Sequence, residues 1–251
     1  MSPSLKSLGT GAVGVVSVVL VWWFVTATEL VNPRILIGPW QLLHRLLELD
    51  WNALFIHSAQ SLKRVALGFV IGSVAGLAVG IWIARSRYAR RALNIPLELL
   101  RPIPPLAWIP LAIIWFGIGD SSKVFVIALG CFFVMLTNTE KGILGLDPAL
   151  VRQGRSYGLE GVALLRRVIL PGILPELMVG VGVSLSLAFA SLVAAEMLGA
   201  NSGLGYMLMM GRVDGDYSLV LIAIIAIALL AFVVDWVARR LLFPRSEAYD
   251  S

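Results

Sequence analysis

The sequence predicts an all-α membrane protein with about six transmembrane helices, and its composition and the spacing of its apolar runs support this fold class. Of the 251 residues, 59% are hydrophobic and only 14% are charged, whereas a soluble domain carries about 25% charged residues. The mean hydropathy is +0.89. Apolar runs near the length of a membrane span, roughly 20 residues, recur along the chain with short polar connections between them.

The first part of the chain contains two candidate spans and one polar segment between them. Gly11 to Val31 is apolar enough for the first span. Gln41 to Leu49 places leucines at helical spacing among polar residues, which predicts an amphipathic helix outside the hydrocarbon layer. Leu62 to Ala84 is the second span. Four arginines within seven residues follow it, namely Arg85, Arg87, Arg90 and Arg91.

The third apolar segment, Leu93 to Gly119, contains five prolines and cannot form one regular helix. Prolines at membrane depth are tolerated where neighbouring protein or cavity water satisfies the freed carbonyl groups. We therefore expect a bent beginning, a helix through Leu111–Phe116 and a turn at Gly117–Ser121.

Three more apolar runs complete the predicted set. Val124 to Thr137 is a short fourth span, Ile173 to Met197 is the fifth, and Tyr217 to Val237 is the sixth. A glycine-rich loop is expected between the last two, from Gly199 to Gly215. Its tight turn at 201–206 is either a contact surface for a soluble protein or an ordinary loop.

The distribution of positive charge predicts the orientation. With both termini in the cytoplasm, 14 of the 20 lysines and arginines lie inside and 6 lie outside, as the positive-inside rule requires. We divide the chain into a first transmembrane helix with a periplasmic amphipathic segment (1–58), a core transmembrane domain (59–242) and a cytoplasmic tail (243–251). The basic residues flank apolar runs and form no stripe of their own, so nucleic-acid binding is rejected.

Several kinds of chemistry lack their residues in this sequence. There is no Gly-x-x-x-x-Gly-Lys-Ser/Thr loop for ATP phosphates and no Gly-x-Ser-x-Gly nucleophile turn. His44 and His57 stand apart from any cysteine partner or His-Glu-x-x-His pattern, so we expect no metal site. The single cysteine, Cys131, excludes an internal disulfide. We expect a transport subunit without catalytic residues and without a cofactor of its own.

Small residues follow a regular spacing in the second span. Gly68, Gly72, Gly76 and Gly80 are four residues apart, which places them on one face of a helix. Small residues on such a face let another helix approach closely. We interpret the stripe as a helix-packing surface, with direct lining of a pore as the alternative.

The fifth span offers candidates for a solute path or a gate, namely Ser184, Ser186, Ser191 and Glu196. A small, weakly polar surface suits a water-filled path along a dimer axis, and it suits close packing equally well. Glu196 is a functional candidate because it is ionisable within a membrane segment. It would attract an ammonium group on the solute or form a gate ion pair, unless it is simply solvated at the outer edge.

The segment from Val151 to Glu176 is too polar for a span and too apolar for a free loop. Arg152–Ser156 and Val162–Val168 each predict a short helix, with Gly158 between them, where a positive φ angle is inexpensive. The residues alone leave two interpretations open. One is a helix–turn–helix on the inner membrane face that presents a side to a partner, and the other is an ordinary cytoplasmic loop.

This segment resembles the cytoplasmic loop of ABC importer permeases, whose pattern is Glu-Ala-Ala, three residues, Gly, nine residues, Ile, any residue, Leu-Pro. Gly158 matches the glycine, Val168 stands for the isoleucine, and Leu170-Pro171 match the close. The opening differs, because Arg152-Gln153-Gly154 stands in place of Glu-Ala-Ala. Further runs resemble the taurine, alkanesulfonate, nitrate and bicarbonate permeases, and their residues are most similar to those of the taurine and sulfonate branch. These runs are Arg101–Leu111, Ile114–Asp120, Leu192–Glu196 and Gly203–Tyr206.

The resemblance implies a type I ABC importer fold whose loop helix, the coupling helix, docks on a separate ATPase. The implied docking residues are Arg152, Gln153, Gly154, Arg155, Ser156, Tyr157, Gly158, Leu159, Glu160 and Gly161. It also implies a homodimer, two ATP-binding subunits that hold ATP and Mg, and a periplasmic or lipid-anchored substrate-binding protein. The location implied is the bacterial inner membrane, in contact with membrane lipid.

The solute implied is taurine or an alkanesulfonate, with nitrate, bicarbonate or another small solute as alternatives. A secondary transporter that works without ATP is an alternative of a different class. That class predicts internal repeats with broken helices in paired positions. The sequence has one broken segment, at Pro102–Pro110, and no counterpart to it.

Overall fold

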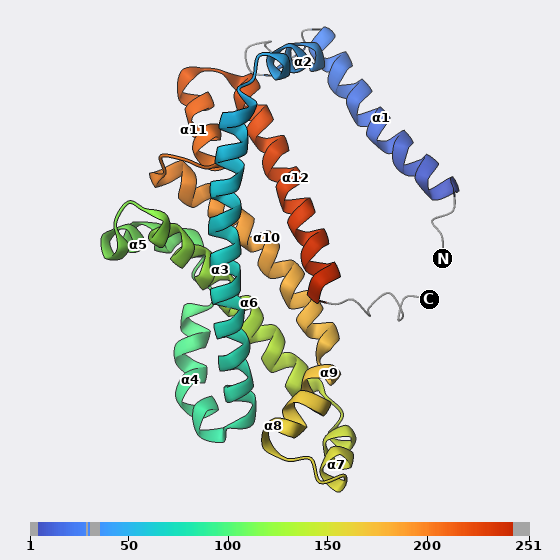
Figure 1. Ribbon diagram of the computed structural model, residues 1–251, viewed down its shortest axis with the longest axis vertical. Helices are drawn as coiled ribbons and strands as arrows, with labels where there is room; N and C mark the ends of the chain where they lie inside the picture. The colour runs from blue at the N-terminus through green and yellow to red at the C-terminus, as the bar shows by residue number, and fades with distance from the viewer. Residues whose placement is uncertain (1–4, 29, 31–35, 243–251) are drawn as a thin grey trace.

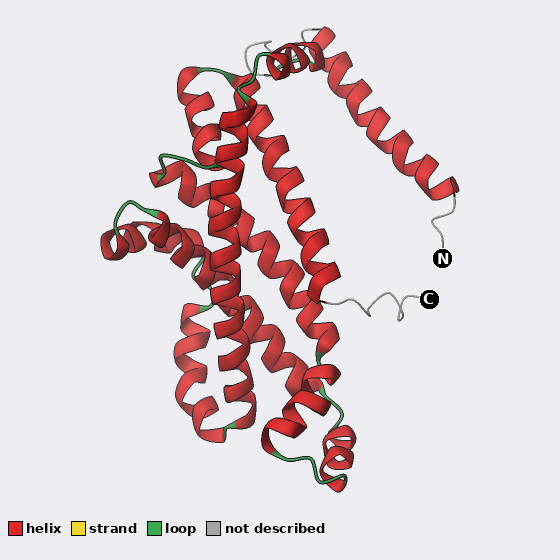
Figure 2. Cartoon of the chain, in the orientation of Figure 1, coloured by secondary structure: helices red, strands yellow, loops and turns green. Residues whose placement is uncertain are grey.

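The computed structural model describes residues 5–28, 30 and 36–242, and all regular structure in these residues is helical (Figure 2). The elements in chain order are α1 Leu5–Ala27, α2 Pro39–Leu47, α3 Trp51–Arg85, α4 Arg87–Leu100, η1 Pro105–Trp108, α5 Ile109–Phe116, α6 Asp120–Gly145, α7 Pro148–Ser156, α8 Gly161–Leu164, η2 Leu165–Ile169, α9 Leu170–Gly172, α10 Leu174–Gly199, α11 Leu204–Asp214 and α12 Tyr217–Leu242.

The helices form an elongated bundle around α3, the longest helix (Figure 1). The helices α6 and α10 pack against α3 and against each other, and α12 packs against α10 and α11. One end of the bundle carries α2 and α11, and the opposite end carries α7 and α8 (Figure 1). We call these the α11 end and the α7 end. The first helix, α1, diverges from the bundle and joins it through α2 (Figure 1).

The all-α membrane fold is confirmed, whereas the count of six spans stays a prediction. Among the described residues, four helices are long and apolar enough to cross a membrane, and they are α3, α6, α10 and α12. The pair formed by α4 and η1–α5 is bent by 89° and makes a fifth span if it counts as one. The helix α1 contributes a shorter apolar stretch, Val16–Ala27.

Two predicted spans are longer in the structure than in the sequence interpretation. The helix α3 begins at Trp51 instead of Leu62, because the Asp50 carboxylate caps it and accepts hydrogen bonds from the backbone N–H groups of Asn52 and Ala53 at 3.0 and 3.1 Å. The fourth span, predicted from Val124 to Thr137, is α6 and runs from Asp120 to Gly145. The additional residues at the start of α3 and at both ends of α6 include polar side chains, so a count of apolar residues leaves them out.

The predicted loop from Gly199 to Gly215 is wrong, because α11 occupies most of it. Gly203 and Gly215, with φ angles of 114° and 72°, flank this helix and do not interrupt it. Leu204 and Met207 are buried, which explains why the segment folds back onto the bundle. The end of the first predicted span at Val31 and the predicted tail at 243–251 lie outside the described residues.

The predicted break in the third apolar segment is confirmed. The helix α4 ends at Leu100, and α5 spans Ile109–Phe116 and stops at Gly117, whose φ angle is 78°. Pro102 and Pro105 have no N–H group, so they cannot donate to the carbonyls one helical turn earlier. The chain therefore turns sharply between α4 and α5, about midway along the bundle (Figure 1).

The helices α3 and α6 pack closely along the glycine stripe at positions 68, 72, 76 and 80. A Cβ atom at Gly72 would overlap the backbone of Ala128, and one at Gly76 would overlap the carbonyl oxygen of Phe132. At these two positions the helices meet backbone to backbone, whereas Gly68 and Gly80 lie against side chains of α6. We call this contact the α3–α6 seam.

The apolar core continues from the seam to α10. Its fully enclosed members come from α3, α6 and α10, and they are Val65, Ile127, Cys131, Ala188, Phe189 and Leu192. A second cluster joins α2, α11 and α12 through Leu42, Met207, Ile222 and Ala223. The core therefore fixes how α10 and α11 meet α3, which is where the buried polar groups lie.

Candidate functional site

The segment at the α7 end folds as two short helices joined by a glycine turn. The helix α7 is capped by Asp147, whose carboxylate accepts a hydrogen bond from the Ala149 N–H at 2.7 Å. Gly158, with a φ angle of 75°, turns the chain, and α8 follows from Gly161. The predicted second helix at 162–168 is present as α8 and the π-helical turn η2.

Most of the predicted docking residues face away from the bundle. Gly154 is buried and Leu159 is half-buried, while the other eight are exposed. Tyr157 is 78% exposed, although tyrosine is a side chain that proteins usually cover in part. Arg152, Arg155 and Glu160 form no ion pair with the described part of the chain. This surface, residues 152–161, is called the docking loop below.

The structure gives a packing reason for glycine at position 154, the third residue of the altered triplet at the start of the docking loop. A Cβ atom at this position would lie 2.9 Å from Leu164 Cδ1 and 2.9 Å from Val168 Cγ2. Glycine therefore lets α7 lie directly on α8 and η2. Arg85, at the end of α3, donates a hydrogen bond to the Gly161 carbonyl at 3.3 Å and ties the docking loop to the long helix.

The four path or gate candidates on α10 do not share one surface. Ser184, Ser191 and Glu196 are 0%, 2% and 1% exposed and face the interior of the subunit. Ser186 lies on the opposite, exposed face. Together with Gly182 and with Arg239 of α12, it lines a groove of about 620 Å³.

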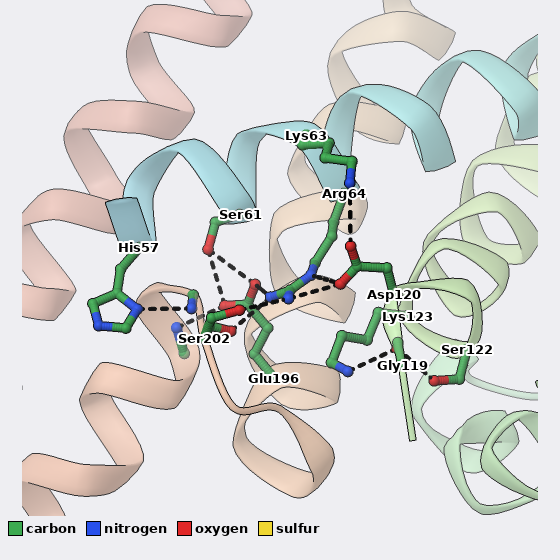
Figure 3. Close-up of polar contacts among 12 residues, drawn as sticks. His57, Ser61, Lys63, Arg64, Gly119, Asp120, Ser122, Lys123, Glu196 and Ser202 are labelled. Atoms are coloured by element: carbon green, nitrogen blue, oxygen red, sulfur yellow. Dashed lines mark hydrogen bonds and ion pairs between the residues drawn. The ribbon is translucent and has the colours of Figure 1, made fainter. Parts of the chain in front are cut away.

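The buried Glu196 belongs to a cluster of charges at the α11 end (Figure 3). The Arg64 guanidinium of α3 donates to Glu196 Oε1 at 2.6 Å and to Asp120 Oδ1 at 2.8 Å. Arg64 is 4% exposed and the Glu196 side chain is fully enclosed, whereas Asp120, at the start of α6, is partly exposed. Arg64, Asp120 and Glu196 are called the charge cluster below.

The charge cluster also holds the connection between α10 and α11. Arg64 donates to the Ser202 carbonyl and hydroxyl at 2.6 and 2.9 Å. The Gly205 N–H donates to Glu196 Oε2 at 2.8 Å. Ser61 donates to the Glu196 carboxylate at 2.9 Å and accepts from the Leu204 N–H at 2.8 Å (Figure 3). Four segments of the chain are thereby joined at one buried point.

The charge cluster is satisfied within this chain, and no described group in it faces an open groove. A buried ion pair is stable when its charges are mutually compensated and its remaining hydrogen-bonding positions are filled. Both conditions hold for Arg64 and Glu196. The arrangement therefore acts as a joint between helices.

The sequence interpretation identified Glu196 and missed its partners. The charge count places Arg64 among the six positive residues outside the membrane, and the predicted turn at Gly117–Ser121 includes Asp120. A usable signal was present, because an arginine and a glutamate that both lie near the same end of apolar helices are expected to pair. The register of α3 against α10 was needed to recognise the pair.

Comparison with known sequences yields one family and several relatives. The profile of the family described as "Binding-protein-dependent transport system inner membrane component" matches residues 72–245. The putative aliphatic sulfonates transport permease protein SsuC of Escherichia coli K12 is 41% identical over 227 residues, which cover 90% of this chain and 86% of that protein. The taurine transport system permease protein TauC of the same organism is 36% identical over 239 residues, which cover 92% and 87%.

Comparison with solved structures gives a matching fold. An inward-facing conformation of the MetNI methionine ABC transporter superposes with a TM-score of 0.61 and 21% sequence identity. The match covers 74% of this chain and 95% of that chain. At this level of identity the similarity concerns the fold of the helix bundle.

Proposed function

The chain belongs to the family of binding-protein-dependent transport system inner membrane components, and from this premise we propose that it carries small sulfonates into the cytoplasm. It is the permease subunit of an ABC importer. The substrate proposal is supported by SsuC and TauC, which are named for aliphatic sulfonates and for taurine and cover most of this chain. Both solutes carry a sulfonate group and a short carbon chain.

We propose that the docking loop receives force from a separate ATPase subunit that binds ATP and Mg. The observation that carries this assignment is its exposure, because Tyr157 and the charged residues around it are largely uncovered by the described part of the chain. Exposed aromatic and arginine side chains are enriched where proteins meet partners. ATP then shifts the population of the assembly through a contact that differs between two states.

The proposed assembly has two copies of this chain, two ATPase subunits and a periplasmic or lipid-anchored binding protein. The α7 end faces the cytoplasm, together with both termini, and the α11 end faces the periplasm of a bacterial inner membrane. The chain itself then needs no catalytic residue. The proposed core domain of 59–242 contains most of α3 and all of α4 through α12, whereas residues 1–58 contain α1, α2 and the first turns of α3.

We further propose that the Ser186 face of α10 borders the solute path. A hydroxyl group beside glycine and Arg239 suits water better than lipid tails, since polar groups in a membrane protein turn toward protein or an aqueous cavity. Ser184 and Ser191 face away from that groove, and Glu196 acts through its ion pair with Arg64.

The docking assignment is tested by replacing residues 152–161 with a flexible Gly-Ser linker of equal length. We expect the variant to insert in the membrane and to lose stoichiometric co-purification with the ATPase subunit. The thermal unfolding midpoint of the isolated permease checks that the bundle is intact. A variant that still binds its ATPase stoichiometrically contradicts the docking assignment. Failure of the unmodified complex to move taurine or alkanesulfonates into proteoliposomes contradicts the substrate.

A further inference from the structure

A second groove lies at the break between α4 and α5. It contains Arg101, which belongs neither to the docking loop nor to the groove beside Ser186. The groove has a volume of about 280 Å³ and is lined by Arg101 from the break and by residues of α6 and α10. It shares Val183 with the groove that contains Ser186, so the two grooves adjoin along the exposed face of α10. We call it the Arg101 groove.

Arg101 is an exposed side chain, and it differs from buried Arg64 and exposed Arg239, which both form ion pairs. Arg64 pairs with Glu196 at 2.6 Å, and Arg239 of the adjoining groove pairs with Asp235 at 2.7 Å. Arg101 forms no ion pair and no side-chain hydrogen bond with the part of the chain that the structure describes. A cation at a broken membrane segment without a carboxylate partner is a candidate for contact with a charged solute.

The backbone at the break offers few donors of its own to an anion. The prolines at 102, 104 and 105 have no N–H groups. The Arg101 guanidinium is therefore the charged donor that this stretch provides. Irregular backbone at membrane depth is found where it is buried in protein or lines a water-filled cavity.

The remaining walls of the Arg101 groove suit a small amphiphilic anion. Thr137 and Asn138 of α6 supply polar atoms on one side, and each also donates a hydrogen bond to the carbonyl four residues earlier on α6. Phe133, Val134 and Leu187 supply an apolar wall. Pockets for small ligands combine an apolar lining with a few convergent polar groups in this way. The volume lies just below the range of about 300–1,000 Å³ that is usual for such pockets, and it suits a solute of few heavy atoms.

We propose that the Arg101 groove holds the anionic head of the translocated solute, with the guanidinium on the sulfonate oxygens and the carbon chain against Phe133 and Leu187. The proposal rests on the proposed function, because it takes the solute to be a small anion. A guanidinium offers two parallel N–H groups to an oxyanion, which lysine cannot reproduce. The groove thus provides one charge-specific step after the binding protein releases its solute.

The test uses the complete complex in proteoliposomes with saturating binding protein. Uptake and ATP hydrolysis are measured together for taurine, ethanesulfonate and nitrate, so that each variant yields a number of solute molecules moved per ATP. We expect Arg101→Ala to lower this ratio about tenfold, with ATP hydrolysis within about twofold of the parent. Arg101→Lys retains an intermediate ratio, because it keeps the charge and loses the paired donors.

Arg91→Ala is the matched control, since Arg91 is an exposed arginine on α4 that does not line the groove. If Arg101→Ala and Arg91→Ala give the same ratio, the groove does not hold the solute. Phospholipid phosphorus per purified complex distinguishes the two sources of an oxyanion. A drop in bound phosphorus in Arg101→Ala with unchanged transport assigns the arginine to a lipid headgroup and overturns the proposal.

The outcomes for the groove and for the proposed substrate are separate. If the parent complex moves nitrate and no sulfonate, the sulfonate function fails, and the groove is judged by the effect of Arg101→Ala on nitrate. If it moves sulfonates and Arg101→Ala is without effect, the function stands and the groove proposal fails. A parent complex that moves none of the three anions contradicts both.

Discussion

The two ends of the bundle differ in whether their charged residues are buried and paired or exposed and unpaired within the described part of the chain. At the α11 end, Arg64 and Glu196 are buried and paired with each other and with the α10–α11 connection. At the α7 end, Arg152, Arg155 and Glu160 lie exposed and without ion pairs among the described residues. The charges of the first region are paired within the chain, whereas those of the second are exposed, and we propose that a partner covers them. Substitutions at the α11 end should therefore alter stability, and those at the α7 end should alter assembly.

The largest effect on stability is expected from Glu196→Ala. The substitution leaves the Arg64 guanidinium buried without its nearest counter-charge, which lowers the free energy of unfolding by about 3–5 kcal/mol. Thermal unfolding of the purified permease in detergent measures the change. The double variant Arg64→Leu with Glu196→Leu should recover much of the loss, because no buried charge is left uncompensated and the partly exposed Asp120 keeps Lys63. Equal stability of Glu196→Ala and the parent would show that the charge cluster does not hold this end together.

A smaller loss of stability is expected from Ser61→Ala. The Ser61 hydroxyl is fully buried, donates to Glu196 and accepts from the Leu204 N–H at 2.8 Å. Its removal leaves a buried N–H group without an acceptor, which costs about 1–3 kcal/mol. The control is Ser58→Ala, one turn earlier on α3, where the hydroxyl only bonds its own helix at the Leu54 carbonyl. If Ser61→Ala lowered the free energy of unfolding no more than Ser58→Ala, the stabilising role of the contacts from Ser61 to Glu196 and Leu204 would be contradicted.

The smallest effect on stability is expected from Tyr157→Ala, which should have a large effect on assembly. The ring is 78% exposed, so removing it should change the free energy of unfolding by less than about 0.5 kcal/mol. Loss of a buried aromatic contact in the complex should weaken ATPase binding by about tenfold or more, as measured by titration of the purified subunits.

Tyr88→Ala serves as the control for the docking loop, since Tyr88 on α4 is 86% exposed and lies outside the loop. It should leave both stability and ATPase binding unchanged. If Tyr88→Ala weakened ATPase binding as much as Tyr157→Ala did, the contrast between the docking loop and the rest of the surface would be lost.

The parts of this molecule that could be predicted from the sequence depend on local pattern. Apolar length predicted the long helices, the prolines at 102–110 predicted the break, and Gly158 predicted the turn at the α7 end. The misread segments have local causes too. Glycines at the ends of α11 imitated a loop, and the capping of α3 by Asp50 extended a helix through polar residues.

The charge cluster and the Arg101 groove depend on how separate helices align, and no local pattern carries that information. Arg64 and Glu196 are 132 residues apart in the chain. They meet because the α3–α6 seam and the core around Leu192 set the register of three helices. In the same way, Arg101 gains Thr137 and Leu187 as neighbours only after α4 has turned into α5 beside α6 and α10.

The α3–α6 seam has a mechanical consequence. From Gly68 to Gly80 it extends along about 18 Å of helix axis, at a rise of 1.5 Å per residue. At Gly72 and Gly76 backbone lies against backbone, so no layer of side chains separates the two helices there. The docking loop follows α6 at one end of this helix pair, and the charge cluster lies towards the other end. If the docking loop is displaced as proposed, we expect α3 and α6 to move together as one rigid pair.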